Sequence, residues 1–588
     1  MRKQYFPGLD GLRAIAVIAI IIFHVNPKWL PGGFLGVDTF FIISGYLITT
    51  LLIKEYENSG SINLVYFWYK RIKRLLPPVL FMMFIVIQYI IFFERDLFFQ
   101  VKKDMYAALV YASNWWYIFD GLDYFQSLEA RPLKHLWSLA IEEQFYLLFP
   151  FLLLILFKIF KKKINVFIVF LIVSLLSMGI MWILYDPSKS ISRIYFGTDT
   201  RLQTLLLGAM LALVWPAYKL RENPPRVLVW IIDIIGLMGS VFLIRSFFFY
   251  TEYSASLFQG GLYILGVFTL LCIMASVHPN TLISKIMSHP ILMWIGQYSY
   301  SLYLWHYPVI VLIHSHYIQG QIPWYVDVFS LIVTFIMAII SYRFIEQPFR
   351  KRGLKTFVDV KSVKQFTTLI VSLYLLLLTP YLVKTATANM TGIEEKIVVK
   401  QTKSIAPAVK RISPIQLDKV LPHKDITSNV YPYAPLFIGD SVLVDINFAT
   451  KKVFPNATID GEVGRNIYEA IPIANKYLEF NRKDGIIVLY LGTNGDFEDV
   501  QMNAILKKFE KAQVFLVTAR VPKDYEAHVN EEMYRSAERY NNVHIIDWYK
   551  ASQGHPEYFA KDGIHLENSG IKAMNKVVTN EIINVIEK

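Results

Sequence analysis

The chain of 588 residues is nearly free of cysteine, and its one cysteine, Cys272, lies in an apolar run. No disulfide can therefore form within it. Internal repeats are absent, and so are the inverted repeats and coupled-ion carboxylates that a transporter or sensor would have. The net charge is +13, but no soluble segment has a basic face for nucleic acid. The first apolar segment lacks a small-residue cleavage pattern and is expected to remain as a membrane helix.

Long apolar runs are what the sequence has in excess. Hydrophobic residues make up 54% of the chain, against ~45–50% in an ordinary soluble protein. Runs of about twenty apolar residues are long enough to cross a bilayer. We predict about eleven membrane spans, at 9–26, 34–53, 75–94, 139–158, 165–184, 199–216, 227–245, 258–277, 291–314, 324–344 and 367–384.

Basic residues gather in alternate loops between these spans. They are Arg2 and Lys3, Lys70 to Arg74, Lys161 to Lys163, Lys219 to Arg226, and Arg350 to Lys355. Cytoplasmic loops carry such an excess of Lys and Arg, so these loops should share the cytoplasmic side. An odd number of spans that starts inside places the C-terminus outside. We therefore expect a multi-pass cell-membrane protein with an extracellular C-terminal domain.

The last part of the chain reads as a soluble domain. Residues 1–384 form the predicted membrane domain, including an extra final span, and 385–434 mix Lys, Thr, Pro and Ala as a linker does. Within 435–588, short β-branched runs alternate with amphipathic helical stretches, which is typical of a parallel sheet flanked by helices. The expected strands are 436–439, 457–460, 485–491, 514–518 and 543–547. An outside domain without disulfides suits a Gram-positive surface.

Two ionisable residues lie in the first span, where charge is expensive and usually functional. Arg13 and His24 are eleven residues apart. At ~100° per residue both point the same way, ~16 Å apart along the helix axis. Arginine can hold a phosphate, and histidine can act as a base or an acyl carrier. The structural alternative is a snorkelling arginine and a histidine bonded to a neighbouring helix.

A second polar group precedes the fourth span. His135, Ser138 and Glu142 share one helical face at spacings of three and four. Glu142 and Glu143 enter the membrane together and need a partner, for which Arg13 and Arg74 are the candidates. Further polar segments lie at 195–201 (YFGTDTR), 299–308 (SYSLYLWHYP) and 343–348 (RFIEQP). Single Tyr and Trp residues in them also fit an interfacial aromatic belt.

Several motifs in order resemble the acyltransferase-3 family of membrane acyltransferases over about residues 5–355. They are 7–13 (PGLDGLR), the Arg13 to His24 spacing, 36–46 (GVDTFFIISGY), 70–77 (KRIKRLLP), 135–143 (HLWSLAIEE) and 299–306 (SYSLYLWH). The resemblance implies an acyl-CoA donor from the cytoplasm, most often acetyl-CoA, and an acceptor outside. No bound cofactor and no metal are expected.

The resemblance also assigns roles to residues of the membrane half. By motif match, His24 handles the acyl group and Arg13 is its companion. Arg71 and Arg74 would bind a CoA phosphate. The other donor-binding or relay positions are His135, Glu142 and Tyr195.

The soluble part carries its own constellation. Ser441 follows the first expected strand in 439–441 (GDS), where a nucleophile's backbone amide can face an oxyanion. Gly464 follows the second strand and Asn494 the third, while Asp562 and His565 stand three apart before the last helix. A non-catalytic domain with a turn, a helix cap and a solvated histidine is the alternative.

In this order the five residues resemble the SGNH hydrolase superfamily. The resemblance makes Ser441 the nucleophile, His565 its base and Asp562 the residue that orients the base. Gly464 and Asn494 would complete the oxyanion hole. Asp547 and His555 are expected to be structural.

The two halves together resemble Gram-positive peptidoglycan O-acetyltransferases. That implies acetylation of the muramic acid C6 hydroxyl, with lysozyme resistance as a result, and peptidoglycan, acetyl-CoA and the lipid bilayer as partners. Two further segments, 441–445 (SVLVD) and 547–552 (DWYKAS), are also similar to that group. Acylation of another surface polysaccharide or teichoic acid stays open, as does a membrane-anchored carbohydrate esterase.

Overall fold

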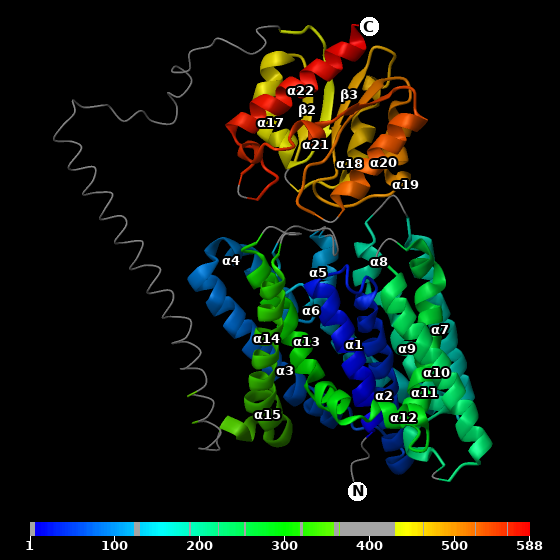
Figure 1. Cartoon of the computed structure of the whole chain (residues 1–588). Coiled ribbons are helices and arrows are strands. Elements are labelled where there is room, and N and C mark those ends of the chain that lie inside the picture. The colour runs from blue at the N-terminus through cyan, green and yellow to red at the C-terminus, as the bar shows by residue number, and fades with distance from the viewer. Residues whose placement is uncertain are drawn as a thin grey trace, which may run out of the picture.

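The computed structural model describes two folded regions (Figure 1). These are residues 6–357, apart from 121, 123–129, 187–189, 222, 252–253 and 318–321, and residues 430–587, apart from 463, 524 and 561. Residues 364 and 368 are also described as helical. Apart from residue 368, the predicted eleventh span lies outside the described residues, and so does nearly all of the predicted linker.

The first region is a bundle of helices. Its ten long helices are α1 (Pro7–Val25), α2 (Gly36–Ser59), α3 (Leu64–Phe93), α6 (Leu136–Ile159), α7 (Lys163–Leu184), α9 (Thr198–Val214), α10 (Arg226–Phe249), α11 (Leu262–Val277), α13 (Pro290–His314) and α14 (Trp324–Ile340). Shorter helices connect them: α4 (Phe98–Leu109), α5 (Ser113–Phe119), α8 (Ser192–Phe196), α12 (Leu282–Met287) and α15 (Gln347–Arg352). The first ten predicted spans each fall on one long helix.

Nine helical stretches of the described residues are long and apolar enough to cross a membrane, and α13 is not among them. The reason is visible in its sequence, because α13 carries Gln, Ser, Tyr and His side chains along its length. Its polar residues Ser299, Ser301 and His306 are buried inside the bundle. A helix surrounded by other helices can carry polar groups that a lipid-facing helix cannot.

Burial separates central from peripheral helices. The apolar windows of α1, α2 and α9 are 72–78% buried, whereas those of α7 and α10 are only 28% buried. The outward faces of α7 and α10 expose large apolar side chains such as Ile172, Ile183, Trp230 and Ile234. In water such faces would be unfavourable, but hydrocarbon is their natural surrounding.

Glycines let the central helices touch through their backbones. A Cβ on Gly45 of α2 would lie 2.0 Å from the carbonyl oxygen of Leu205 in α9. A Cβ on Gly208 of α9 would lie 2.0 Å from the carbonyl oxygen of Ile42 in α2. Small residues at membrane helix interfaces allow this close approach. No larger residue fits at either position unless the two helices separate.

The second region is a parallel sheet in a three-layer arrangement (Figure 1). Its strands are β1 (Leu436–Gly439), β2 (Thr458–Gly461), β3 (Ile486–Tyr490), β4 (Gln513–Val517) and β5 (Val543–Ile546), in the order β2-β1-β3-β4-β5. All four pairings are parallel. The predicted fold class is therefore confirmed, and the strand positions agree within one or two residues.

Helices cover both faces of this sheet. On one face, α17 (Ser441–Val453) and α22 (Asn568–Ile586) pack their Leu443, Ile446 and Val578 side chains onto the strands. On the other face lie α18 (Ile467–Ala474), α19 (Asp499–Leu506) and α20 (Glu526–Arg539), with Met502 and Val529 in their core. The short α21 (Trp548–Ala551) follows β5 and begins at its cap, Asp547.

Candidate active site

The strand order brings three predicted residues to one edge of the sheet. β1 lies between β2 and β3. Because the strands are parallel, the segments after their carboxyl ends are neighbours, so Ser441 is flanked by Gly464 and Asn494. Ligands of open α/β sheets bind where the strand order reverses in this way.

Ser441 is the first residue of α17, and a buried aspartate fixes its position. Asp440 caps the helix by accepting a hydrogen bond from the amide of Val442 at 2.9 Å. The Thr493 hydroxyl donates to the other Asp440 oxygen. Burial raises the pKa of Asp440 to about 6, although both hydrogen bonds oppose the shift. The Ser441 hydroxyl makes no hydrogen bond to any other described residue, so it is available to a base or a substrate.

Arg465 ties the segment after β2 to the end of β1. Its guanidinium donates to the carbonyl oxygens of Gly439 at 3.2 Å and Asp460 at 2.6 Å. The carbonyl oxygen of Arg465 in turn accepts from the Asn494 side-chain amide at 3.3 Å. Gly464, next to it, has φ +83°, a conformation that favours glycine. The two expected oxyanion donors are thus held by one connected set of hydrogen bonds.

The expected acid–base pair is present. His565 Nδ1 lies 2.5 Å from Asp562 Oδ2, and both side chains are over 40% exposed. The amides of Ile564 and His565 also donate to Asp562 Oδ1. Burial alone would raise the pKa of Asp562, but these hydrogen bonds hold it below its usual value. Since Nδ1 is held by the carboxylate, Nε2 is the nitrogen of His565 that is left to act as base.

A contact across the fold ties the segment that carries this pair to the serine helix α17. Asp445 lies one turn after Ser441 on α17, and its Oδ2 accepts from the amide of Leu566 at 2.9 Å. The neighbours of both catalytic candidates, Asp440, Val442 and Ile564, line one small cavity. A hydroxyl, an imidazole, a carboxylate and oxyanion donors at one edge can carry out acyl transfer through a serine ester.

Two residues expected to be structural have structural contacts. Asp547 caps α21 by accepting from the amide of Lys550 at 3.0 Å. His555 pairs with Glu557 at 2.8 Å and stacks on Tyr558.

In the membrane half, three histidines from different helices gather in one place. His24 Nδ1 on α1 lies 3.2 Å from His306 Nε2 on α13. His135, immediately before α6, has its ring 5.8 Å from that of His306. Neither nitrogen of His135 has a hydrogen-bond partner among the described residues, although the side chain is buried. The structure therefore brings His24 and His135 together and adds His306, a residue that the sequence did not single out as a site residue.

The predicted cations meet at the other end of α1. Arg13, Arg71 and Arg74 lie close enough to interact electrostatically. The Nε atoms of Arg71 and Arg74 are buried without a hydrogen-bond partner in the part of the chain that the structure describes. Donors left in this state suit an anionic ligand.

The surroundings of Glu142 combine hydroxyls and arginines. Glu142 accepts hydrogen bonds from Ser44 at 2.9 Å and Tyr146 at 3.1 Å, and it lies close enough to Arg13 and Arg74, the two expected partners, to interact with them electrostatically. Arg13 pairs at 2.8 Å with Asp10, which lies one turn away on the same helix and is the nearer carboxylate.

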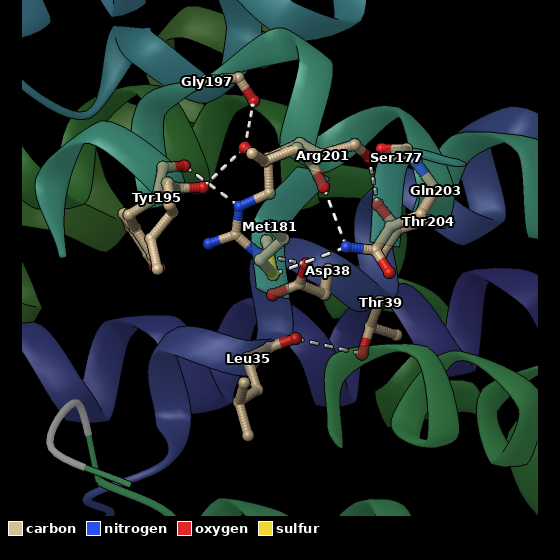
Figure 2. Close-up of polar contacts among 12 residues, drawn as sticks. Leu35, Asp38, Thr39, Ser177, Met181, Tyr195, Gly197, Arg201, Gln203 and Thr204 are labelled. Carbon is tan, nitrogen blue, oxygen red and sulfur yellow. Dashed lines mark hydrogen bonds and ion pairs between the residues drawn. The ribbon is translucent and has the colours of Figure 1, made fainter. Parts of the chain in front are cut away.

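Tyr195 contacts a buried ion pair between Arg201 and Asp38, which the sequence analysis did not predict. Figure 2 shows Arg201 of α9 directed toward Asp38 of α2, at 2.7 Å. Both side chains are 1% exposed. The Arg201 Nε atom donates to the Tyr195 carbonyl oxygen, and its Cζ lies 4.3 Å from the Tyr195 ring centre. Asp38 was visible in the sequence only as part of a motif.

The bundle of helices holds buried histidines and two arginines, Arg71 and Arg74, whose Nε atoms lack a hydrogen-bond partner among the described residues. The C-terminal α/β domain adds a serine, a histidine and an aspartate. Together these features indicate a membrane acyltransferase. The family model described as "Acyltransferase domain" matches residues 6–343. The chain belongs to this acyltransferase family.

Curated relatives extend the similarity over both halves. O-acetyltransferase OatA of Staphylococcus aureus strain MRSA252 is 48% identical over 578 residues, which is 98% of this chain and 96% of the relative. The OatA protein of strain NCTC 8325 gives the same values. The chain is thus a membrane O-acetyltransferase.

Among solved structures, the C-terminal catalytic domain of Streptococcus pneumoniae peptidoglycan O-acetyltransferase A is similar to part of the chain. The sequence identity is 25%, the match covers 26% of this chain and 93% of that domain, and the TM-score is 0.23.

Proposed function

We propose that this enzyme takes acetyl groups from cytoplasmic acetyl-CoA, passes them across the membrane to Ser441, and transfers them to peptidoglycan. The acceptor is the C6 hydroxyl of muramic acid. The modified glycan is expected to resist lysozyme. The OatA relatives, which cover nearly the whole chain, support an enzyme whose two halves work together.

One observation carries the outer step: Ser441, Gly464 and Asn494 follow three adjacent parallel strands, and Asp445 ties the His565 segment to the serine helix. His565 Nε2 removes the proton from Ser441 Oγ as that oxygen attacks the acetyl carbonyl. Gly464 N–H and the Asn494 amide stabilise the oxyanion. The bond between the acetyl carbon and its carrier breaks, and the carrier leaves with the proton that His565 took from the serine. The glycan hydroxyl then attacks the serine ester, the neutral His565 takes the proton of that hydroxyl, and Ser441 Oγ leaves with this proton.

The inner step uses the polar residues of the bundle. The buried, unpartnered Nε atoms of Arg71 and Arg74, with Arg13 beside them, support a site for the CoA phosphates. His24 handles the acyl group at the other end of α1. His135, Glu142 and Tyr195 contribute donor binding or relay. The basic loops support an orientation in which the arginine end lies at the cytoplasmic side and the Ser441 domain lies outside the cell.

The test is transfer in vesicles of defined orientation. Labelled acetyl-CoA is enclosed with the protein inserted so that the outer domain faces the medium, and peptidoglycan fragments are added outside. Label on the muramic acid C6 hydroxyl is expected. A parallel arm offers teichoic acid, and a second arm offers pre-acetylated glycan without acetyl-CoA.

Each arm has a distinct outcome. Label on teichoic acid but not on peptidoglycan would replace the acceptor. Loss of acetyl from pre-acetylated glycan, with no transfer from acetyl-CoA, would make the protein an anchored esterase. His24→Ala should block transfer from enclosed acetyl-CoA while the same protein still hydrolyses a small ester added outside.

A further inference from the structure

The hydrogen bond between His24 and His306 joins α1 to α13, residues that are 282 positions apart. His306 is completely buried, and its Nε2 lies 3.2 Å from His24 Nδ1. The other nitrogen of His306, Nδ1, lies 2.6 Å from the carbonyl oxygen of Tyr303. The two rings are thus part of one chain of hydrogen bonds that ends on a backbone carbonyl.

The direction of this chain follows from the carbonyl. A carbonyl oxygen only accepts, so the proton of His306 must be on Nδ1. The Nε2 atom of a neutral His306 is then an acceptor as well. His24 Nδ1 therefore faces two acceptors, His306 Nε2 and the Ile20 carbonyl oxygen at 2.9 Å. Both contacts require the proton of His24 to be on Nδ1, which leaves the lone pair of its neutral ring on Nε2.

The surroundings of His306 fix its orientation. The hydroxyl of Tyr303 donates to the His135 carbonyl oxygen at 2.9 Å and lies 2.5 Å from Ser138 Oγ. The Tyr307 ring packs edge-on against His24, with ring centres 5.0 Å apart. The Tyr303 contacts anchor α13 to the start of α6 and the Tyr307 contact anchors it to α1, so the acceptor atom of His306 stays in place as His24 reacts.

We propose that His306 is a positioning residue that fixes the tautomer of His24 and presents its Nε2 to the acyl donor. This inference rests on the proposed role of His24 in the acyl step. The ring gains one positive charge when Nε2 takes up a proton. It gains the same charge when Nε2 bonds to the acyl carbon of the donor thioester, as the C–S bond breaks and CoA leaves as the thiolate. The Nδ1–H hydrogen bond to His306 then stabilises that charge, as a carboxylate does in a catalytic triad. A neutral imidazole does this without a second buried charge.

Two substitutions separate the two nitrogens of His306. In His306→Gln the amide oxygen can stand where Nε2 stood and accept from His24. In His306→Asn the shorter side chain reaches only the Nδ1 position, so the contact with Tyr303 is kept and the acceptor for His24 is lost. We expect His306→Asn to lower kcat for vesicle transfer by roughly 100-fold, within the range of general acid–base catalysis. KM for acetyl-CoA should not change, and His306→Gln should keep activity within about threefold of the unaltered enzyme.

Hydrolysis of a small ester by the outer domain of the same variants is the folding control, and it should be unchanged. Equal activity of the Gln and Asn variants, in a protein that His24→Ala inactivates, would overturn the role of His306 and leave the proposed function standing. Full transfer by His24→Ala would instead overturn the proposed function of His24 itself.

The tautomer can also be measured without altering His306. In the full-length enzyme in lipid bilayers, labelled with ¹⁵N-histidine, the His24 resonances are those that His24→Ala removes. Their nitrogen chemical shifts should show a protonated Nδ1 and an unprotonated Nε2. A proton on Nε2 would overturn the proposal, even if both His306 variants failed to fold.

Discussion

Each half of the molecule holds, by its Nδ1 atom, one histidine for which we propose a role in acyl transfer, but the holding group differs. In the C-terminal domain (residues 430–587), which we propose lies outside the cell and call the outer domain, the partner of His565 is a carboxylate, Asp562. Both side chains are over 40% exposed. In the membrane half the partner of His24 is His306, which is fully buried. The same orientation is thus achieved with a charged partner in one region and with a neutral partner in the other.

The difference follows from the cost of charge in each surrounding. Water solvates an exposed carboxylate, so Asp562 can stay ionised at little expense. An ionised group inside the bundle needs a partner or several hydrogen bonds. Asp38 meets this need with Arg201, and Glu142 with two hydroxyls. In the membrane half these two carboxylates are each held by a cation or by hydroxyls, whereas the ring that holds His24 Nδ1 is the imidazole of His306.

Substitution of Ser441, the proposed nucleophile, is the strongest test of the separate roles proposed for the two halves. Ser441→Ala should lower glycan acetylation by roughly 10⁴-fold or more, because the first acyl acceptor outside is lost. The rate of transfer from enclosed acetyl-CoA is the measurement. Ser569→Ala, an exposed serine on α22, is the matched control. Normal acetylation by the Ser441 variant would show that the membrane half delivers acetyl directly to the glycan.

A buried ion pair of the membrane half should contribute more to the free energy of unfolding than an exposed ion pair of the C-terminal domain. Arg201→Ala leaves Asp38 buried and unpaired, and should cost about 3–5 kcal/mol of stability. Arg539→Ala removes an exposed pair with Asp499 at 2.5 Å and should change the stability far less, because solvent screens exposed ion pairs. Thermal unfolding of both variants in the same detergent gives the comparison. Equal losses would contradict the contrast, and Asp38→Asn should restore part of what Arg201→Ala loses.

Asn494, the proposed oxyanion donor of the outer domain, should affect kcat and not KM. Asn494→Ala is expected to reduce kcat by roughly 10²–10³-fold with little change in KM for the glycan. Steady-state kinetics separate the two constants. The exposed amide of Asn456 provides the control substitution. A change confined to KM would make Asn494 an acceptor-binding residue.

Asp440 should make the outer domain less stable as the pH rises. Its folded pKa of about 6 is above the ordinary value of 3.8. Its favourable contribution is therefore fully present below pH ~4 and is lost as the pH passes through ~6, a difference of about 3 kcal/mol. Asn keeps the helix cap but does not titrate, so Asp440→Asn should gain this amount relative to the unaltered protein between pH 4 and 7. Unfolding of the outer domain, followed in the full chain, is the measurement; Asp484→Asn, at an exposed carboxylate, should show no such trend.

The smallest expected effect is at Asp445. Asp445→Ala frees the Leu566 amide and should lower turnover about tenfold through a small displacement of His565. Asp445→Asn keeps an accepting oxygen and should retain activity. If both variants reduce the free energy of unfolding but leave turnover unchanged, the contact only stabilises the fold.

The outer site could be predicted largely from sequence because its parts follow strands. Once β1, β2 and β3 were recognised as parallel, the residues after them had to meet at one edge, and the structure places Ser441, Gly464 and Asn494 there. The membrane contacts had no such guide. His24 with His306 and Asp38 with Arg201 depend on which helices pack together, and apolar runs carry little information on that. The hydrogen bonds of Glu142 with Ser44 and Tyr146 were missed for the same reason.

The glycine contacts between α2 and α9 have a consequence for how acetyl could travel. At Gly45 and Gly208 the two helix backbones are in direct contact, with no side chain between them. The helices therefore cannot slide or rotate against each other without breaking this contact. The two helices should therefore move together as one rigid unit. Any opening toward the inside or the outside must then come from loops or peripheral helices, or the acetyl group must pass from residue to residue through a core of fixed shape.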